Sequence, residues 1–165
     1  MNDYNGIPEE LKILNHWICY KLVPKVDKDG KPYNDKVPKN PNTGGNAASN
    51  MPSTWADFNT AVAAVSKYNL DGIGFQFRGS GYIGIDIDHC IREDGSLSDM
   101  AEDVVTALNS YTEISPSGTG LHIFMKGKKP GEKCTTKKNP VTGEKLEIYD
   151  SGRFFTVTGN VFKRW

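Results

Sequence analysis

Two aspartates stand two residues apart in the segment 82–88, which reads YIGIDID. Alternate side chains of a strand point to opposite faces, so Asp86 and Asp88 share one face and three isoleucines share the other. The two carboxylates repel each other, and a divalent cation between them would remove that repulsion. Gly84, on the aspartate face, is expected to leave room for a ligand close to the sheet. An ordinary solvent-facing strand end would show the same Asp-x-Asp pattern.

A turn of small residues, SPSGTG, occupies positions 115–120 and is followed by a strand that carries His122. Backbone N–H groups of such a turn can converge on a phosphate. The candidate phosphate contacts in the turn are Ser115, Ser117, Gly118, Thr119 and Gly120. The imidazole of His122 can donate a hydrogen bond to the same phosphate group. A plain hairpin turn followed by a histidine with ordinary hydrogen bonds would look the same.

A third carboxylate stands on the alternating segment LEIY at 146–149. Glu147 faces away from its apolar neighbours, so it can complete a three-carboxylate metal site, and Asp150 is the alternative for that place. An exposed acid paired with Lys145 would fit the same pattern. Arg153 follows a short step later and can contact a phosphate or a nucleic-acid strand, although an isolated arginine is more often an ordinary surface cation.

The residues above must be positioned by helices and strands, and the pattern of these elements in the sequence predicts an α/β (α+β) domain. We expect a mostly antiparallel sheet with flanking helices. Helices are expected at 8–14, at 98–108, and from a cap at Ser53 or Thr54 up to Asp71, with Trp55 on the apolar face. Strands are expected at 17–23, 73–77, 82–88, 111–114, 121–125, 146–149 and 154–157. The strands 73–77 and 82–88 are predicted to pair around the turn 78–81. A long loop or ribbon is expected at 25–50, and a basic loop at 126–145.

The bulk composition fits one globular domain spanning all 165 residues. Lys+Arg and Asp+Glu both number 20, which argues against a protein that simply coats a polyanion. The three cysteines are far apart and form no C-x-x-C pair, so a structural zinc site is not expected. The N-terminal segment is polar, and no apolar run is long enough for a membrane span. These features predict a cytoplasmic protein without a membrane partner.

Together these segments resemble the archaeo-eukaryotic primase superfamily, most closely the primase–polymerase domains of phage and plasmid replication proteins. That family carries an acid-x-acid at the end of an apolar strand, then a small-residue turn with a histidine, then an apolar-acid strand. The matching residues here are Asp86 and Asp88, the turn from Ser117 to His122, and Leu146-Glu147. Several further phrases are similar to the family, including KVP at 36–38, GIGF at 72–75 and RFFTVTG at 153–159. The resemblance spans nearly the whole chain.

The resemblance implies a DNA primase or DNA-directed polymerase, a nucleotidyltransferase with an RRM-like (RNA-recognition-motif-like) part in its fold. It implies a two-metal site of Mg²⁺ or Mn²⁺ on Asp86, Asp88 and Glu147, and triphosphate contacts from Ser117 and His122. The expected substrates are dNTP or NTP with a single-stranded DNA template and primer. Lys36 and Lys39 are expected near the nucleic acid. The chain is expected to be the N-terminal part of a larger replication protein that works with a helicase domain or protein.

Two other functions are compatible with parts of the sequence. A rolling-circle replication nuclease would need a closely spaced histidine pair and a tyrosine nucleophile, whereas His16, His89 and His122 are scattered. A non-catalytic nucleic-acid-binding module would stack bases on aromatic side chains such as Trp17, Phe75 and Phe77 and would not need the carboxylates.

Overall fold

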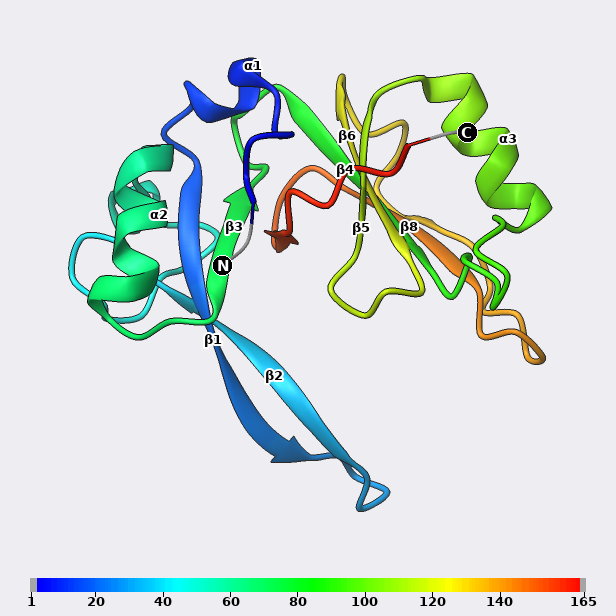
Figure 1. Cartoon of the computed structure of the whole chain (residues 1–165), viewed down its shortest axis with the longest axis horizontal. Helices are drawn as coiled ribbons and strands as arrows, with labels where there is room; N and C mark the ends of the chain where they lie inside the picture. The colour runs from blue at the N-terminus through cyan, green and yellow to red at the C-terminus, as the bar shows by residue number, and fades with distance from the viewer. Residues whose placement is uncertain (1–2, 164–165) are drawn as a thin grey trace.

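Two antiparallel sheets form the protein, where the sequence predicted one mostly antiparallel sheet (Figure 1). The computed structural model describes residues 3–163, so the predicted domain bounds 1–165 extend beyond the described range at both ends. The first sheet has the order β2 (Pro32–Lys39), β1 (Trp17–Val26), β3 (Gly72–Gln76), β9 (Phe154–Val157). The second has the order β5 (Tyr111–Ile114), β6 (Leu121–Lys126), β4 (Tyr82–Asp88), β8 (Lys145–Tyr149), β7 (Cys134–Thr135). The predicted mixed α/β class is confirmed.

Helices α1 (Glu9–Lys12) and α2 (Phe58–Lys67) cover the first sheet, and an aromatic core that includes Trp17 and Phe75 lies beneath them. The predicted cap of α2 at Ser53 or Thr54 is wrong, because those residues belong to the 3-10 helix η1 (Pro52–Thr54). Asp57 caps α2 instead, and its carboxylate accepts a hydrogen bond from the Thr60 N–H at 3.0 Å. Within residues 3–163, no helix is long and apolar enough to cross a bilayer.

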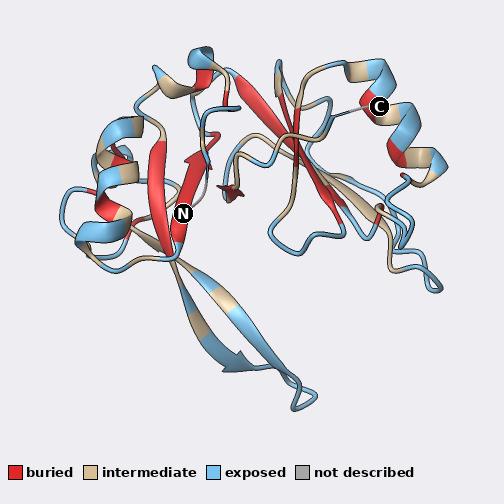
Figure 2. Ribbon diagram, in the orientation of Figure 1, coloured by how far each residue is buried: buried red, intermediate tan, exposed pale blue. Residues whose placement is uncertain are grey.

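The paired strands β1 and β2 extend away from the body as a two-stranded ribbon (Figures 1 and 2). Their far ends are coloured as exposed in Figure 2, whereas the base of β1 is buried in the first sheet. The predicted loop or ribbon at 25–50 is therefore a ribbon in its first half. Lys36 lies at the base half of this ribbon, opposite Leu22 of β1.

Helix α3 (Asp99–Leu108) packs on one face of the second sheet, against Ile83, Ile85 and Ile87 of β4. Its N-cap is Ser98, the residue at which the sequence predicted this helix to begin. The four strands β4, β5, β6 and β8 lie in the spatial order β5-β6-β4-β8, and helix α3 follows β4, the first of them along the chain. This is the arrangement of a split β-α-β sheet, which an RRM-like part implies. A loop that contains the short strand β7 stands where the second helix of that arrangement would lie.

The chain changes sheets between β3 and β4, so the predicted pairing of 73–77 with 82–88 is wrong. β3 pairs with β1 and β9, whereas β4 pairs with β6 and β8. Gly79 and Gly81 in the connecting turn have positive φ angles of 76° and 79°, a conformation that glycine adopts freely. The turn residues allow a hairpin, but the neighbours that cover each buried strand come from distant parts of the chain.

Gly84 does not leave room for a ligand, contrary to the sequence-based expectation. A β-carbon added at this position would lie 2.6 Å from the Phe155 ring and closer still to Phe77. Both rings lie over β4, and the Phe77 and Phe155 centroids are 4.8 Å apart in an edge-to-face arrangement. Gly84 therefore allows the aromatic core of the first sheet to approach the second sheet.

This close approach predicts that Gly84→Ala destabilises the protein by about 1–3 kcal/mol, because the added methyl group overpacks the two rings. Gly131→Ala is the control, since a methyl group there meets no atom within 4 Å. Urea unfolding of both variants measures the difference. Equal stability of the Gly84 variant and the unmodified protein would contradict this packing argument.

Candidate active site

Three carboxylates converge on the face of β4 opposite the isoleucines. Asp86 of β4 lies directly across from Glu147 of β8 in the strand register, and Asp88 follows two residues later on the same face. One ligand oxygen from each of the three lies within 4.8 Å of the others. Asp150, the alternative third carboxylate, is not in this group and lies 3.9 Å from the Lys129 ammonium group. The alternation of the strands thus produces the cluster that the sequence predicted.

The three acids are held in different electrostatic environments. Burial raises the pKa of Asp86, the charge of His122 opposes that rise, and the charges of Asp88 and Glu147 add to it. Burial also acts to raise the pKa of Glu147, but hydrogen bonds from Lys145 and Tyr149 outweigh it and the pKa is lowered. The Lys145 ammonium group donates to Glu147 at 2.7 Å. Asp86 is therefore the acid for which ionisation is costly without a bound cation.

His122 of β6 lies across from Asp86 on the other side of β4. Its Nδ1 is 3.0 Å from the backbone oxygen of Thr156, and because a carbonyl only accepts, Nδ1 carries the hydrogen. Nε2 is 3.8 Å from an Asp86 oxygen and faces the carboxylates. The ring stacks on Phe155 at 4.7 Å, so its orientation is fixed by packing as well as by hydrogen bonding.

A buried glutamate that sequence reasoning missed lies behind the histidine. Glu113 of β5 is fully buried, and one of its oxygens is 3.8 Å from His122 Nδ1. Its carboxylate accepts hydrogen bonds from Tyr111 Oη and from the N–H groups of Thr158 and Gly159. These donors satisfy a charge that would otherwise be costly to bury. In strand 111–114, Glu113 shares a face with Tyr111 and lies on the opposite face from Ile114, so alternation alone does not mark Glu113 as buried.

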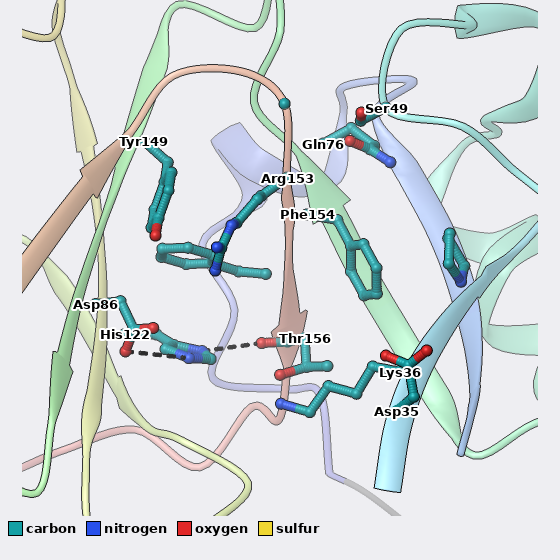
Figure 3. Close-up of a pocket in the computed structure, with 13 residues that line it drawn as sticks. Asp35, Lys36, Ser49, Gln76, Asp86, His122, Tyr149, Arg153, Phe154 and Thr156 are labelled. Atoms are coloured by element: carbon teal, nitrogen blue, oxygen red, sulfur yellow. Dashed lines mark hydrogen bonds and ion pairs between the residues drawn. The ribbon is translucent and has the colours of Figure 1, made fainter. Parts of the chain in front are cut away.

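A cavity of about 420 Å³ lies between the two sheets, within the usual size range of ligand sites. Figure 3 shows Asp86 and His122 at one end of it and Gln76 and Ser49 at the other. Of the predicted site residues, the cavity is lined by Asp86, His122, Arg153 and Lys36. It is also lined by residues that sequence reasoning missed: Asp35, Pro38, Ser49, Gln76, Tyr149, Gly152, Phe154, Phe155 and Thr156.

Two cationic side chains reach this cavity from different elements. The Arg153 guanidinium group lies 4.8 Å from the centre of the Tyr149 ring. Lys36 belongs to an exposed part of β2, and Figure 3 shows its amino group directed across the cavity toward the Asp86 side. Desolvation there lowers the pKa of Lys36, and the charges of Asp86 and Asp88 act in the opposite direction. Both cations can meet an anionic ligand beside the carboxylates.

The small-residue turn lies next to the carboxylates but does not line the cavity. A β-carbon on Gly120 would lie 2.7 Å from the Ile87 oxygen and 3.5 Å from Asp88 Cα. Two of its N–H groups are already bonded within the turn, Gly118 to the Ser115 oxygen and Thr119 to the Ser117 hydroxyl. The expected open nest of N–H donors is therefore wrong for these two positions, because the turn satisfies its own backbone.

The hydroxyl groups of the turn are the polar atoms that face outward. The Ser117 hydroxyl is 2.9 Å from that of Ser115 and 3.1 Å from that of Thr119. Ser117, Gly118 and Thr119 are exposed. This row of hydroxyl groups can rotate to donate to an anion placed beside Asp88.

Lys39, the second predicted nucleic-acid contact, lies outside the cavity. Its ammonium group donates to the side-chain oxygen of Asn46 at 2.9 Å. This contact joins the end of β2 to the following loop. The role predicted for Lys39 stays a prediction.

The carboxylate cluster fits a hard divalent cation on the chemistry of its donors. Asp86, Asp88 and Glu147 supply only oxygen atoms, which suit Mg²⁺ or Mn²⁺ rather than a soft metal. Asp88 is exposed and Asp86 and Glu147 are half-buried, so the cluster opens to solvent on one side. Within residues 3–163, this is the group of acids, histidines and cysteines whose ligand atoms lie close enough together to share a metal ion.

Comparison with known proteins points to one phage enzyme. No protein-family model matches the chain. The chain is 41% identical over 149 residues to a DNA primase-polymerase of the Nitratiruptor phage NrS-1. The matched region covers 88% of this chain and 19% of the relative, so the chain spans about a fifth of that protein's length. The chain is thus related to one part of a primase-polymerase.

The raised pKa of Asp86 predicts a pH-dependent change in the stability of the metal-free protein. A carboxyl group with a raised pKa in the folded state favours folding while protonated, and that contribution is lost as the pH rises through the folded pKa. Asp86→Asn mimics the protonated group at every pH. We expect this variant to gain stability relative to the unmodified protein as the pH rises, by on the order of 1 kcal/mol at neutral pH.

Thermal unfolding in EDTA over a series of pH values measures this difference. Asp94→Asn is the control of opposite sign, because hydrogen bonds from Ser96 lower the pKa of Asp94. Ionised Asp94 is stabilising above its unfolded pKa, so its replacement should lose stability as the pH rises. The same pH response at both positions would refute the assignment.

Proposed function

We propose that this chain is the catalytic core of a metal-dependent nucleotidyltransferase that synthesises or extends a DNA or RNA primer on a template strand. The observation that carries the proposal is the three-carboxylate cluster beside a cavity with cationic walls. The relationship to a phage DNA primase-polymerase supports it. We assign the chain to the archaeo-eukaryotic primase superfamily and treat residues 1–165 as one catalytic domain within a longer replication protein.

Asp86, Asp88 and Glu147 are the metal ligands in this proposal. They would hold two Mg²⁺ or Mn²⁺ ions, which would supply charge neutralisation for the attacking hydroxyl group and the departing pyrophosphate. The three carboxylates stand on the neighbouring strands β4 and β8, whose pairing fixes them relative to one another. Lys145 keeps Glu147 ionised, so that ligand is ready at neutral pH.

The nucleotide, a dNTP or NTP, occupies the cavity with its phosphates at the carboxylate end. His122 presents Nε2 to that end, and Arg153 approaches from the turn between β8 and β9. In the turn, Gly120 lies against Asp88 and Gly118 supplies the tight bend, while the side chains of Ser115, Ser117 and Thr119 supply hydroxyl donors for the terminal phosphates. Phosphoryl transfer depends chiefly on such positioning and charge neutralisation.

The template and primer approach along the first sheet and its ribbon. Lys36 lines the cavity and Lys39 ends the same strand, and we propose that both contact phosphates of single-stranded DNA. A helicase domain or protein as partner is proposed from the sequence resemblance, and a cytoplasmic location remains the expectation from the sequence composition. The rolling-circle nuclease receives no support, since His16 stacks on Trp55 and Phe75 while His122 lies with the carboxylates.

Replacing both Asp86 and Asp88 by Asn is expected to reduce template-dependent primer extension by about 100-fold or more, because the cations lose two ligands. A primer-extension assay with dNTP or NTP, with Mg²⁺, Mn²⁺ or EDTA, measures this. Asp27 and Asp29 form a second Asp-x-Asp pair, at the tip of the ribbon, and the same double substitution there is the control. A folded Asp86/Asp88 variant that extends a primer at the unmodified rate would sink the proposal, and a binding module that needs no carboxylates would then be favoured.

His122→Ala is expected to weaken binding of a nucleoside triphosphate about 10-fold while binding of single-stranded DNA changes less than about twofold. The reason is that Nε2 faces the phosphate end of the cavity, and the variant loses the hydrogen bond that a ring protonated on both nitrogens would donate to a phosphate. Titrations with a fluorescent nucleotide and a fluorescent DNA, each with Mg²⁺, separate the two effects. His89→Asn, at an exposed histidine outside the cavity, is the control, and equal losses for both ligands in the His122 variant would count against this role.

A further inference from the structure

Gln76 carries a buried carboxamide whose hydrogen-bonding groups have no partner within residues 3–163. The residue is 1% exposed, and neither its side-chain nitrogen nor its side-chain oxygen has a hydrogen-bond partner among the described residues. The hydroxyl group of Thr156, a residue that is 2% exposed, is also without a partner there. Leaving such groups unpaired costs free energy, and buried polar groups are paired in the great majority of cases.

Gln76 and Thr156 are both among the residues that line the cavity together with Asp86 and His122. In the register of β3 and β9, Thr156 is opposite Gly74 and Phe154 is opposite Gln76, so the two polar residues lie two strand positions apart on one face. That spacing corresponds to roughly 7 Å along a strand. Thr156 is the nearer to the carboxylates, since its backbone oxygen bonds His122, and Figure 3 shows Gln76 at the far end.

The backbone around Gln76 is fixed, so the carboxamide is held in place. The Gln76 backbone N–H donates to the His16 backbone oxygen at 2.8 Å, and His16 Nδ1 is 2.8 Å from the Gln76 backbone oxygen. Gly74 on the same face carries no side chain, and the Phe154 ring occupies the space beside it. These contacts hold the backbone that carries an uncharged donor and acceptor. A ligand that binds Gln76 would therefore meet a residue at a fixed position on the strand.

We propose that Gln76, with the Thr156 hydroxyl group, binds the uncharged nucleoside part of the nucleotide, through its sugar hydroxyls or its base edge. This inference rests on the proposed function, which puts the phosphates at the carboxylate end. A nucleotide so oriented brings its neutral half toward Thr156 and Gln76. A carboxamide and a hydroxyl group both donate and accept, so they match neutral polar groups and have no charge to offer a phosphate.

The sequence contains a single glutamine, which makes a direct test possible. Protein labelled with ¹⁵N in the glutamine side chain gives one pair of carboxamide signals in an NMR spectrum. We expect these signals to shift when a dNTP or NTP is added with Mg²⁺ and to stay in place when inorganic triphosphate is added with Mg²⁺. If the carboxamide signals do not shift under conditions where the nucleotide is bound, the assignment is overturned.

Gln76→Met and Thr156→Val remove the polar atoms with little change in shape. We expect each to weaken nucleotide binding about 5- to 10-fold, leave triphosphate binding unchanged, and raise Tm by about 2–4 °C in the absence of ligand. Thr112→Val is the matched control, because the Thr112 hydroxyl is buried but donates to the Ser110 oxygen at 3.0 Å. That control should lower Tm and leave nucleotide binding unchanged.

The outcomes separate this inference from the proposed function. A loss that depends on the 2′-hydroxyl group assigns the contact to the sugar, and a loss that differs among the four bases assigns it to the base edge. A lower Tm with unchanged nucleotide affinity in Gln76→Met would show a purely structural glutamine and overturn the inference alone. Unmodified protein that binds no nucleotide with Mg²⁺ or Mn²⁺ would overturn the proposed function together with it.

Discussion

The alternation of side chains along β4 is the constraint on which the rest of the structure depends. One face supplies three isoleucines to the core beneath α3, and the other places Asp86 between His122 on β6 and Glu147 on β8. Slipping the register by one residue would bury the acids and expose the isoleucines, so the hydrophobic core enforces the geometry of the site. The position of the carboxylates is therefore secured by apolar packing on the opposite face of the same strand.

The cavity exists because the chain crosses between the sheets twice. It leaves the first sheet after β3, builds β4 to β8, and returns through the turn before β9. Phe77 and Phe155, one at each crossing, meet over Gly84 and join the two sheets at the back of the cavity. Any side chain at position 84 would separate the two rings from β4. The same contact that closes the core thus sets the distance between the carboxylate wall and the wall formed by β9.

Local patterns were enough to predict the strand faces, helix α3 and the convergence of the three acids, because alternation and capping act over a few residues. They failed where distant segments decide the outcome. The sequence around Gly79 allows a hairpin between β3 and β4. In the structure, however, β3 pairs with β1 and β9, and β4 pairs with β6 and β8. Trp55 has the spacing of a helix face but packs with Ile18 and Ala47 in a separate cluster. Gln76 is a polar residue inside the buried run 72–77, and only the assembled cavity shows why a polar residue there matters.

Two parts of the cavity lining carry different kinds of unfavourable free energy. Like charges crowd Asp86, and on β3 and β9 a buried carboxamide and a buried hydroxyl group have no hydrogen-bond partner among residues 3–163. A cation would relieve the first and an uncharged polar group would relieve the second, so the metal-bound nucleotide that we propose would meet both. Sites that break the usual rules of charge pairing and polar satisfaction are where function is expected to reside. Because such a ligand binds only the folded state, it would stabilise the fold in proportion to its affinity, which links folding and substrate binding at one site.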